Sequence, residues 1–436
     1  MTLFRATVLD TPSSPFAGGV LRSQEDCGLL VQEGVITARG PFERLRPELR
    51  DEPVVDLREG LLLPGLVDTH VHFPQARIIG GLGMPLLDWL DQCALPEEMR
   101  LADVDYARGV ARDFVTGLVY AGTTTALVFG SHYASAVEVM FEAADRSGLR
   151  VTTGLVTSDR LLPTPLLTTA ERGYVESSEL AGRWHGKGRL RYAVTPRFSL
   201  SASDAVLEAC AATFTEVSGS WFTSHVNENL HEIREVASLF GGAAYVDTYD
   251  RHGLLTPRSV LAHDVHPTDA ELATLAGRGS AVAHCPTSNA ALGSGLFPMR
   301  RHVEAGVRVA LGSDVGAGTG FSLFKEGLQA YFGQQLLGPQ GLPLTSAHLL
   351  WLSTAAGADA LGLADDVGDL SVGKQLDAIW VVPQPGDPLA VGLGNAASAD
   401  DALSKVFALG TASDVAGVWV GGDQIAAGRW GRPRQH

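Results

Sequence analysis

Residues 64–75 read Pro-Gly-Leu-Val-Asp-Thr-His-Val-His-Phe-Pro-Gln, and this stretch decides how the rest of the chain is interpreted. Leu66 to His72 alternates as a β-strand does, and residues two apart on a strand share a face. His70 and His72 therefore point the same way near the end of a predicted strand. Histidine is the commonest metal ligand, so the pair predicts half of a metal site, with two structural histidines as the alternative.

Composition places the chain among globular proteins and narrows its partners. The 436 residues are 45% hydrophobic and 19% charged, which suits one large domain plus a smaller one. The formal net charge of -16 predicts no nucleic-acid and no membrane partner. There is no signal-peptide pattern and no apolar run of about 20 residues, so we expect a cytoplasmic protein. The 4 cysteines form no Cys-x-x-Cys pair and are interpreted as free thiols.

Short apolar, β-branched runs recur along the chain and alternate with helical patterns. The runs lie at 66–72, 123–129, 150–156, 192–198, 221–226, 259–265, 279–284 and 307–313. Helical patterns lie at 103–120, 135–146, 203–217, 231–240, 268–278 and 321–335, several beginning at Asp or Ser residues suited to N-caps. Eight strands separated by crossovers predict an α/β fold, a (β/α)8 TIM-like barrel.

Both ends of the chain carry short strand-like runs separated by Gly and Pro. Those near the start lie at 4–9, 28–31, 35–39 and 61–63, and those near the end at 368–376, 378–382, 406–408 and 415–420. We expect the two ends to pair into a small β-sandwich domain. The predicted division is therefore a composite sandwich domain of residues 1–63 and 369–436 around a catalytic barrel of residues 64–368.

Polar residues that end an apolar strand are the site candidates, because active-site groups of such barrels lie at the carboxyl ends of the strands. The candidates are His70, His72, His225, Glu228, His263 and Asp314. Each alone has an ordinary explanation, since an isolated strand histidine is usually structural and an Asp after a strand is usually an N-cap. Their shared position at one rim of one predicted barrel predicts a catalytic centre.

Three neutral imidazoles and one carboxylate suit a zinc-type ion with one position left open for water. Such an ion lowers the pKa of that water from about 15.7 to about 7. Glu228 lies three residues past His225, where it can move a proton without binding the metal. His263 is suited to polarise the water or the substrate.

Four motifs together resemble the amidohydrolase superfamily. They are Pro-Gly-Leu-Val-Asp-Thr-His-Val-His (64–72), Ser-His-Val-Asn-Glu-Asn (224–229), Ala-His-Asp-Val (262–265) and Gly-Ser-Asp-Val-Gly-Ala-Gly (312–318). Within it the chain is similar to the guanine deaminases, through Phe-Pro-Gln (73–75), Leu-Leu-Asp-Trp-Leu (86–90), Thr-Pro-Arg-Phe-Ser (195–199) and Ala-His-Cys-Pro-Thr-Ser-Asn (283–289). The likeness covers almost the whole predicted barrel and continues into the flanking segments.

The resemblance implies zinc-dependent hydrolytic deamination of guanine to xanthine and ammonia by a homodimer with one Zn²⁺ per subunit. The implied metal ligands are His70, His72, His225 and Asp314, and the implied catalytic residues are Glu228, His263 and Asp314. The implied substrate contacts include Gln75, Arg197, Phe198, Glu228 and His263. One departure is Asp264, which follows His263 where relatives often carry an uncharged residue. Contact between the two would raise the basicity of His263.

The pocket chemistry agrees with a purine. Arg197 offers paired donors that match the O6 and N7 acceptors of guanine but meet a donor amine at C6 of adenine. Gln75 can reach a ring nitrogen or amine near the metal, and Phe198 and Trp89 can flank a flat ring. Core packing is the alternative for either aromatic residue, and a surface ion pair for Arg197.

Two rival functions remain open from the sequence. Other amidohydrolase substrates, such as 8-oxoguanine, a pterin or a triazine, share the catalytic core and differ in the pocket. A non-catalytic scaffold would keep the barrel only for assembly. The complete ligand set argues against the scaffold, because assembly does not require it.

Overall fold

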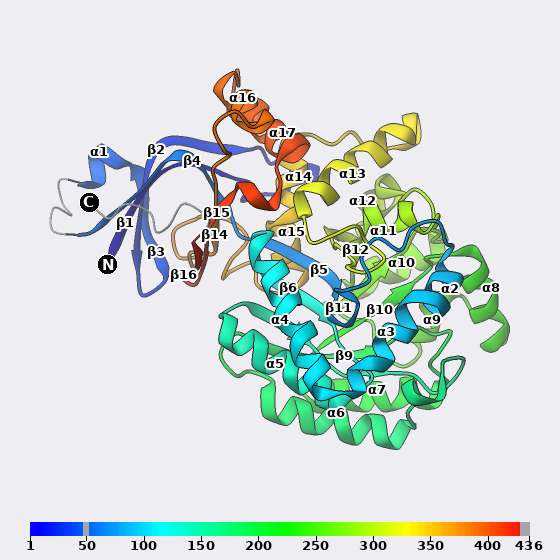
Figure 1. Ribbon diagram of the computed structural model, residues 1–436. Coiled ribbons are helices and arrows are strands. Elements are labelled where there is room, and N and C mark those ends of the chain that lie inside the picture. Colours follow the sequence, from blue (N-terminus) through cyan, green and yellow to red (C-terminus); the bar gives the residue numbers. More distant parts are fainter. Residues whose placement is uncertain (47–51, 428–436) are drawn as a thin grey trace.

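The computed structural model describes residues 1–46 and 52–427, and a parallel barrel with its helices forms the larger part, on the right in Figure 1. Its eight main strands within the described residues are β5 (Leu66–His72), β6 (Thr123–Phe129), β7 (Arg150–Thr153), β9 (Leu190–Pro196), β10 (Trp221–Val226), β11 (Ser259–His263), β12 (Ala281–His284) and β13 (Arg308–Leu311). The ring closes between β13 and β5, where the Asp314 N–H donates to the His70 carbonyl at 2.9 Å. The predicted fold class is confirmed.

The barrel strands are buried on both faces, because side chains fill the interior and helices cover the outside. Every residue of β5, β6 and β10 is buried. The predicted run 150–156 divides at Gly154 into β7 and β8 (Val156–Thr157), which pairs separately with β9. A Cβ at Gly154 would lie only 1.8 Å from the Ala193 carbonyl oxygen, so this close approach of two backbones requires glycine.

Helices connect the strands around the outside of the barrel (Figure 1). They include α4 (Val104–Tyr120), α5 (Ala134–Ser147), α6 (Ala170–Trp184), α7 (Asp204–Glu216), α8 (Leu230–Leu239), α9 (Tyr245–Asp250), α10 (Asp269–Arg278), α11 (Pro286–Ala291), α12 (Met299–Ala305), α13 (Leu323–Leu336), α14 (Ser346–Ser353) and α15 (Ala355–Ala360). The six predicted helical patterns are confirmed, and Asp103, Ser203 and Thr268 are N-caps that accept backbone N–H groups. Helix α6 was not predicted, because its sequence is largely polar and contains two glycines.

The two ends of the chain meet in a second sheet, as predicted. Its strand order is β16-β15-β14-β4-β1-β2-β3, from β1 (Thr2–Asp10), β2 (Arg22–Gln32), β3 (Val35–Pro41), β4 (Val54–Pro64), β14 (Ala378–Val381), β15 (Val415–Val420) and β16 (Asp423–Ala427). Antiparallel pairing of β14 with β4 joins the ends. The edge-to-face contact of Phe4 with Trp419, at 5.9 Å between ring centroids, crosses two intervening strands. The sheet therefore folds over a core of its own.

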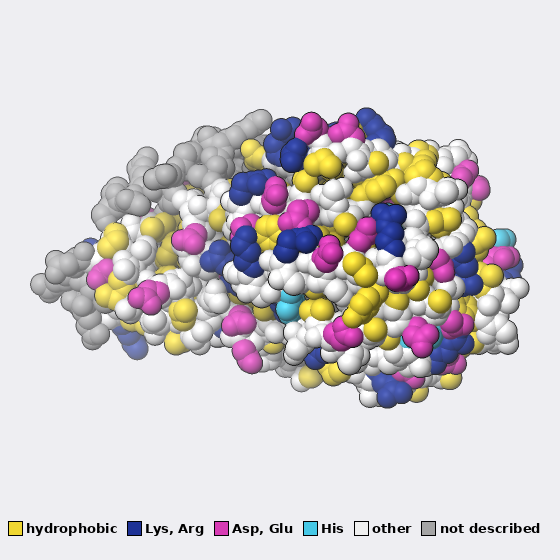
Figure 2. Space-filling view, turned by 90° about the horizontal axis from the view of Figure 1, so that it is seen from below, with side chains coloured by type: hydrophobic (Ala, Val, Ile, Leu, Met, Phe, Trp, Pro, Cys, Tyr) yellow, Lys and Arg dark blue, Asp and Glu magenta, His cyan; other side chains and the backbone are white. Residues whose placement is uncertain are grey.

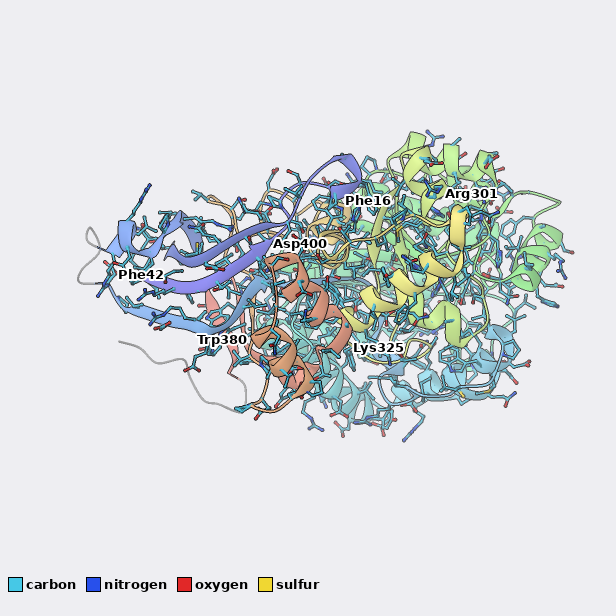
Figure 3. The ribbon with its side chains drawn as sticks, turned by 90° about the horizontal axis from the view of Figure 1, so that it is seen from above. Phe16, Phe42, Arg301, Lys325, Trp380 and Asp400 are labelled. Atoms are coloured by element: carbon cyan, nitrogen blue, oxygen red, sulfur yellow. The ribbon has the colours of Figure 1, made fainter. Side chains whose placement is uncertain are left out.

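Two strand predictions near the end of the chain are wrong. Residues 406–408 lie in helix α17 (Ala399–Leu409), whose apolar face packs on α13 and α14. Residues 368–376 form a loop, although its Lys374 carbonyl accepts from the Ile36 N–H at 2.8 Å and so borders β3. Figure 3 shows α17, at Asp400, between the sheet near Phe42 and helix α13 at Lys325. The domain boundaries stay a prediction, and residues 47–51 and 428–436 of the predicted sandwich domain lie outside the described residues.

The outer surface carries both signs of charge. On the face in Figure 2, acidic side chains lie among Lys and Arg side chains. Some pairs span one turn of a helix, as Arg172 and Glu176 do at 2.9 Å. No helix in the described part of the chain has the length and apolar character needed to cross a bilayer.

Candidate active site

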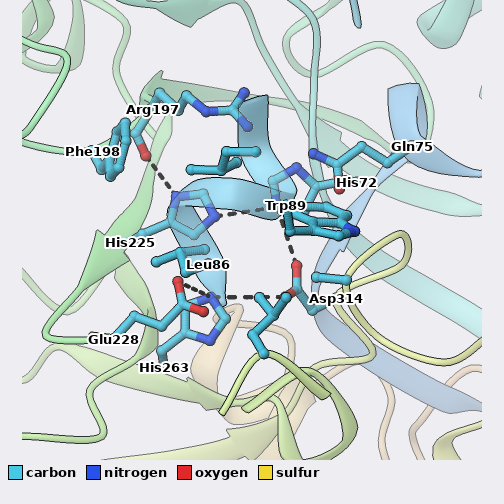
Figure 4. A pocket seen from close by; sticks show the side chains of 13 residues that line it. His72, Gln75, Leu86, Trp89, Arg197, Phe198, His225, Glu228, His263 and Asp314 are labelled. Carbon is cyan, nitrogen blue, oxygen red and sulfur yellow. Dashed lines mark hydrogen bonds and ion pairs between the residues drawn. The ribbon is translucent and has the colours of Figure 1, made fainter. Parts of the chain in front are cut away.

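The predicted metal ligands converge at the carboxyl ends of β5, β10 and β13 (Figure 4). The Nε2 atom of His72 lies 3.1 Å from that of His70 and 3.2 Å from that of His225. The Oδ1 atom of Asp314 lies 3.4 Å from His70 Nε2 and 3.3 Å from His72 Nε2. Adjacent ligand atoms on one zinc ion, with bonds of about 2.05 Å, lie about 3 to 3.5 Å apart. These separations suit neighbouring ligands of one ion, and the possible ligand atoms in the described residues group as His70, His72 and His225 and as His70, His263 and Asp314.

The proton positions also suit a cation. His225 Nδ1 lies 2.6 Å from the Arg197 carbonyl oxygen, which can only accept, so Nδ1 carries the proton and Nε2 turns a lone pair to the centre. Burial lowers the pKa of His225 well below its usual value and that of His70 to about 4, which keeps both imidazoles neutral. Lone pairs on nitrogen atoms facing one another at this distance repel unless a proton or a cation lies between them.

Asp314 supplies the negative charge of this cluster. Burial alone would raise its pKa, but the neighbouring His70, His72 and His263 outweigh burial and hold the pKa well below the usual value. Asp314 has a φ of +48°, in the left-handed region that only a few per cent of residues other than glycine adopt. A Cβ at Gly312 would lie 2.9 Å from the Cβ of His70, so glycine lets β13 approach β5 here. The backbone is thus held in a strained form that presents the carboxylate.

Asp68 ties the ends of β5 and β13 together beneath the ligands. Its Oδ1 accepts from the backbone N–H of His70 at 3.2 Å and of Ser313 at 3.0 Å, while Ser313 Oγ donates to Oδ2 at 2.5 Å. Burial raises the pKa of Asp68 to about 7. This carboxyl group fixes the backbone from which His70 and Asp314 extend, a role that the sequence did not predict.

Glu228 and His263 face each other beside the ligand cluster. Glu228 Oε2 lies 3.5 Å from His263 Nε2, and Oε1 accepts a hydrogen bond from Ser294 Oγ at 3.2 Å. Burial raises the pKa of Glu228 above its usual value. Burial lowers the pKa of His263, but the nearby charges of Glu228 and Asp314 outweigh it and raise the pKa overall. Asn289 Oδ1 lies 2.9 Å from His263 Nδ1 and fixes the ring.

Asp264 turns away from His263. Its Oδ1 accepts from Asn227 Nδ2 at 2.9 Å, and its Oδ2 lies 2.8 Å from His302 Nε2. Asp264 therefore does not raise the basicity of His263 through direct contact. Instead, Asp264 links β11 to α12 behind the site.

The remaining predicted site residues line a cavity of about 360 Å³ (Figure 4). Its walls include His72, Gln75, Trp89, Arg197, Phe198, His225, Glu228, His263 and Asp314. Trp89, together with Leu86 and Leu90, comes from a helical segment that follows β5 and consists of α2 (Leu86–Trp89), the π-helical turn η4 (Leu90–Ala94) and α3 (Leu95–Met99). His70 lies behind the residues that line the cavity and contacts the other candidate ligands there.

One buried residue at the pocket was missed by the sequence analysis. Glu98 of α3 accepts from Gln75 Nε2 at 2.8 Å through Oε1 and from Arg197 Nη1 at 2.6 Å through Oε2. It does not follow a barrel strand, which was the criterion for the other candidates. The available signal was an acidic pair in the largely apolar stretch Ala-Leu-Pro-Glu-Glu-Met-Arg-Leu (94–101).

The sequence profile of the amidohydrolase family matches residues 61–425. The chain belongs to the amidohydrolase family. This amidohydrolase is 57% identical to the probable guanine deaminase of Deinococcus radiodurans, over 98% of the chain and 99% of that relative. Among solved structures, the guanine deaminase of E. coli superposes with a TM-score of 0.94 at 36% identity, covering 98% of this chain and 100% of that one. A guanine deaminase of C. acetobutylicum with bound guanine in the active site gives a TM-score of 0.90 at 26% identity, with coverage of 98% and 100%.

Proposed function

We propose that this amidohydrolase converts guanine and water to xanthine and ammonia with one Zn²⁺ per subunit. The observation that carries the proposal is a single cavity lined both by the metal-ligand candidates and by Arg197 and Gln75, whose side chains suit a purine. The relatives support the same substrate, because the C. acetobutylicum structure has guanine bound in its active site. Their similarity to this chain extends over nearly its full length.

Three imidazoles and a carboxylate favour zinc over magnesium or calcium, which prefer oxygen ligands. In this proposal His70, His72, His225 and Asp314 hold the ion. A bound zinc ion would make a water molecule acidic enough to react near neutral pH. The open side of the cluster faces the cavity, where Glu228 and His263 lie.

Glu228 is proposed to move the protons. It accepts a proton from the attacking water as the new C–O bond forms at C2, and it passes that proton to a ring nitrogen. It then accepts the second proton of the former water from the new C2 hydroxyl and gives it to the amine, so that the C–N bond breaks, C2 becomes a carbonyl and ammonia leaves. The raised pKa of Glu228 suits a group that must both take and give a proton. His263 Nε2, 3.5 Å from Glu228, is placed to orient the reacting groups.

Arg197 and the aromatic residues are proposed to select the ring. The donors of Arg197 match the O6 and N7 acceptors of guanine and would oppose the amine of adenine, a difference worth about 1–3 kcal/mol for a good bidentate pair. Phe198 and Trp89 line the cavity and are 5% and 2% exposed, so both present largely desolvated rings to a flat ligand.

The test of substrate is direct. The purified protein should release ammonia from guanine with stoichiometric xanthine, and should leave adenine unchanged. The same assay applied to 8-oxoguanine, a pterin and a triazine separates the neighbouring substrate classes. Faster turnover of one of these, with no xanthine formed from guanine, would reassign the substrate. We also propose a cytoplasmic homodimer, which light scattering of the purified protein and cell fractionation would test.

Replacing Glu228 tests the proton transfer. Glu228→Gln should lower kcat by about 10³-fold or more, because general acid–base catalysis contributes about 10²–10⁴-fold. Zinc content and guanine binding should be retained, since the amide has nearly the same shape. Glu235→Gln on the exposed side of α8 is the matched control and should leave kcat unchanged. Glu228→Gln with kcat within tenfold of the wild type would remove Glu228 from the proposed role.

A further inference from the structure

We propose that Glu98 is a positioning residue that determines substrate specificity, by fixing which atoms of Gln75 and Arg197 face the ligand. The inference rests on the proposed function and deepens it. The observation behind it is that the two oxygens of one buried carboxylate each receive a donor from a different pocket side chain, Gln75 at 2.8 Å and Arg197 at 2.6 Å. Figure 4 shows Gln75 and Arg197 together on the side of the cavity across from Glu228.

The buried Glu98 side chain carries a negative charge. Its side chain is 3% exposed, and burial alone would raise its pKa. The neighbouring Arg197 and His132 outweigh burial and hold the pKa well below the usual value. Glu98 is therefore an anion whose oxygens only accept hydrogen bonds.

An acceptor at this position sets the orientation of the Gln75 amide. The Nε2 group must face Glu98, because the opposite orientation would place two acceptor oxygens 2.8 Å apart. The Oε1 atom is then turned away from Glu98, to the side where Gly316 approaches; a Cβ on Gly316 would lie 2.7 Å from it. Gln75, which lines the cavity, therefore has a fixed amide orientation in which Oε1 is the side-chain atom left as an acceptor.

The same carboxylate holds the guanidinium of Arg197. Nη1 is committed to Glu98, which neutralises a positive charge that is 4% exposed and would otherwise be costly to bury. The rotation of the planar guanidinium group is then restricted, so its remaining N–H groups act as donors in a fixed direction. His132 Nδ1 also lies 3.3 Å from the same Glu98 oxygen.

A fixed donor and a fixed acceptor in the pocket recognise a ring edge that carries an acceptor next to a donor. The lactam of guanine has an acceptor oxygen at C6 next to a donor N–H at N1. The corresponding edge of adenine has a donor amine next to an acceptor nitrogen, so both contacts would fail. Without the Glu98 charge, the amide of Gln75 could turn over and the guanidinium could rotate, and this discrimination would weaken.

Two inhibitors that differ at C6 separate positioning from simple loss of structure. Hypoxanthine carries the lactam but no amine at C2, and unsubstituted purine carries neither. In Glu98→Gln, we expect the inhibition constant of hypoxanthine and the KM of guanine to rise about tenfold or more, since one good bidentate contact is worth that much. The inhibition constant of purine and the zinc content should change less than about twofold.

Glu97→Gln is the matched control. Glu97 is the adjacent buried glutamate, but it accepts from Tyr106 at 2.5 Å and pairs with Arg100 at 3.0 Å instead of with pocket residues. It should leave the ratio of the two inhibition constants unchanged. If Glu98→Gln does not fold, Glu98→Asp, which keeps the charge on a shorter side chain, should still weaken hypoxanthine several-fold more than purine.

Equal weakening of both inhibitors, or no weakening of either, would overturn the role of Glu98. The proposed function fails separately, if the wild-type protein forms no xanthine from guanine. Inhibitor binding can be measured by calorimetry in either case, so the two failures are distinguishable.

Discussion

Two buried carboxylates, Asp10 in the terminal sheet and Glu228 at the barrel rim, are treated very differently by their surroundings. Asp10 accepts from Arg22 Nε at 2.8 Å, from Arg39 Nη1 at 2.9 Å and from the Leu370 N–H at 2.9 Å. Burial opposes its charge, but the two arginines lower its pKa below the usual value. Glu228 is equally buried, has one hydrogen bond from Ser294, and its pKa is raised.

The difference separates structural groups from groups kept available for a ligand. Asp10 has its hydrogen-bonding capacity filled by β2, β3 and the segment before β14, so it joins the two ends of the chain. At the barrel rim, carboxylate and imidazole side chains face one another. Few hydrogen-bond donors from the rest of the described chain reach them. Buried polar groups are normally satisfied, so such a cluster indicates partners from outside the chain. Three changes test this contrast, in order of expected effect.

The largest effect is expected from removing a proposed metal ligand at the rim. His225→Asn should lose bound zinc and essentially all guanine turnover, because one of the three imidazole nitrogens is gone. Treating the wild type with a chelator should have the same result, and adding Zn²⁺ back should restore activity to the wild type only. Metal analysis and ammonia release measure both effects.

The exposed His231, at the start of α8, provides the control for this change. His231→Asn should keep both zinc and turnover. A chelated wild-type enzyme that remains fully active while free of metal would show that the imidazole cluster is not a catalytic metal site.

A smaller effect, on stability and not on chemistry, is expected at Asp10. Asp10→Asn leaves Arg39 buried without its anion, and removing one member of a buried ion pair costs about 3 kcal/mol of unfolding free energy. Because the folded-state pKa of Asp10 is lowered, its contribution is present above about pH 4 and is lost as pH falls through that lower value. Urea unfolding at pH 7 and at pH 3 measures this, while kcat per folded molecule should stay unchanged.

Asp26, which pairs with Arg5 at 2.5 Å but is 42% exposed, is the control for Asp10. Asp26→Asn should cost less than about 1 kcal/mol, because solvent screens an exposed pair. Equal losses in the two variants would show that Asp10 is no more structural than a surface charge.

The sequence predicted the barrel and the clustering of the candidate site residues because both follow from local patterns. Alternation marks β5, and strand order brings distant strand ends such as His225 and Asp314 to one rim. The pairing of the chain ends was predicted from strand-like runs alone. Residues 406–408 were misassigned because a short apolar run fits one turn of a buried helix as well as a strand.

Contacts that depend on a loop's path could not be predicted in this way. Glu98 reaches Gln75 and Arg197 only because the helical segment after β5 folds over the rim, and no spacing in the chain reports that path. The direction of Asp264 was likewise undetermined, since its partner His302 lies 38 residues away. Side chains on regular strands are thus predictable from periodicity, whereas partners supplied by loops require coordinates.

The smallest effect is expected at Ser294, whose side chain gives Glu228 its one hydrogen bond within the described residues. Ser294 Oγ donates to Glu228 and lowers its pKa, so Ser294→Ala should raise that pKa further above the usual value. Glu228 must be ionised to accept a proton from water, so the acidic limb of kcat/KM should move to higher pH. The shift should be up to about one pH unit, because a hydrogen bond to a charged group is worth about 1.5 kcal/mol and one unit about 1.4 kcal/mol.

The backbone carbonyl of Ser294, 2.7 Å from His266 Nε2, is unaffected by the change, which leaves the loop in place. Rates measured from pH 5 to 8 decide the matter: an unchanged limb assigns it to a group other than Glu228, and a limb moved to lower pH contradicts the donor role of Ser294.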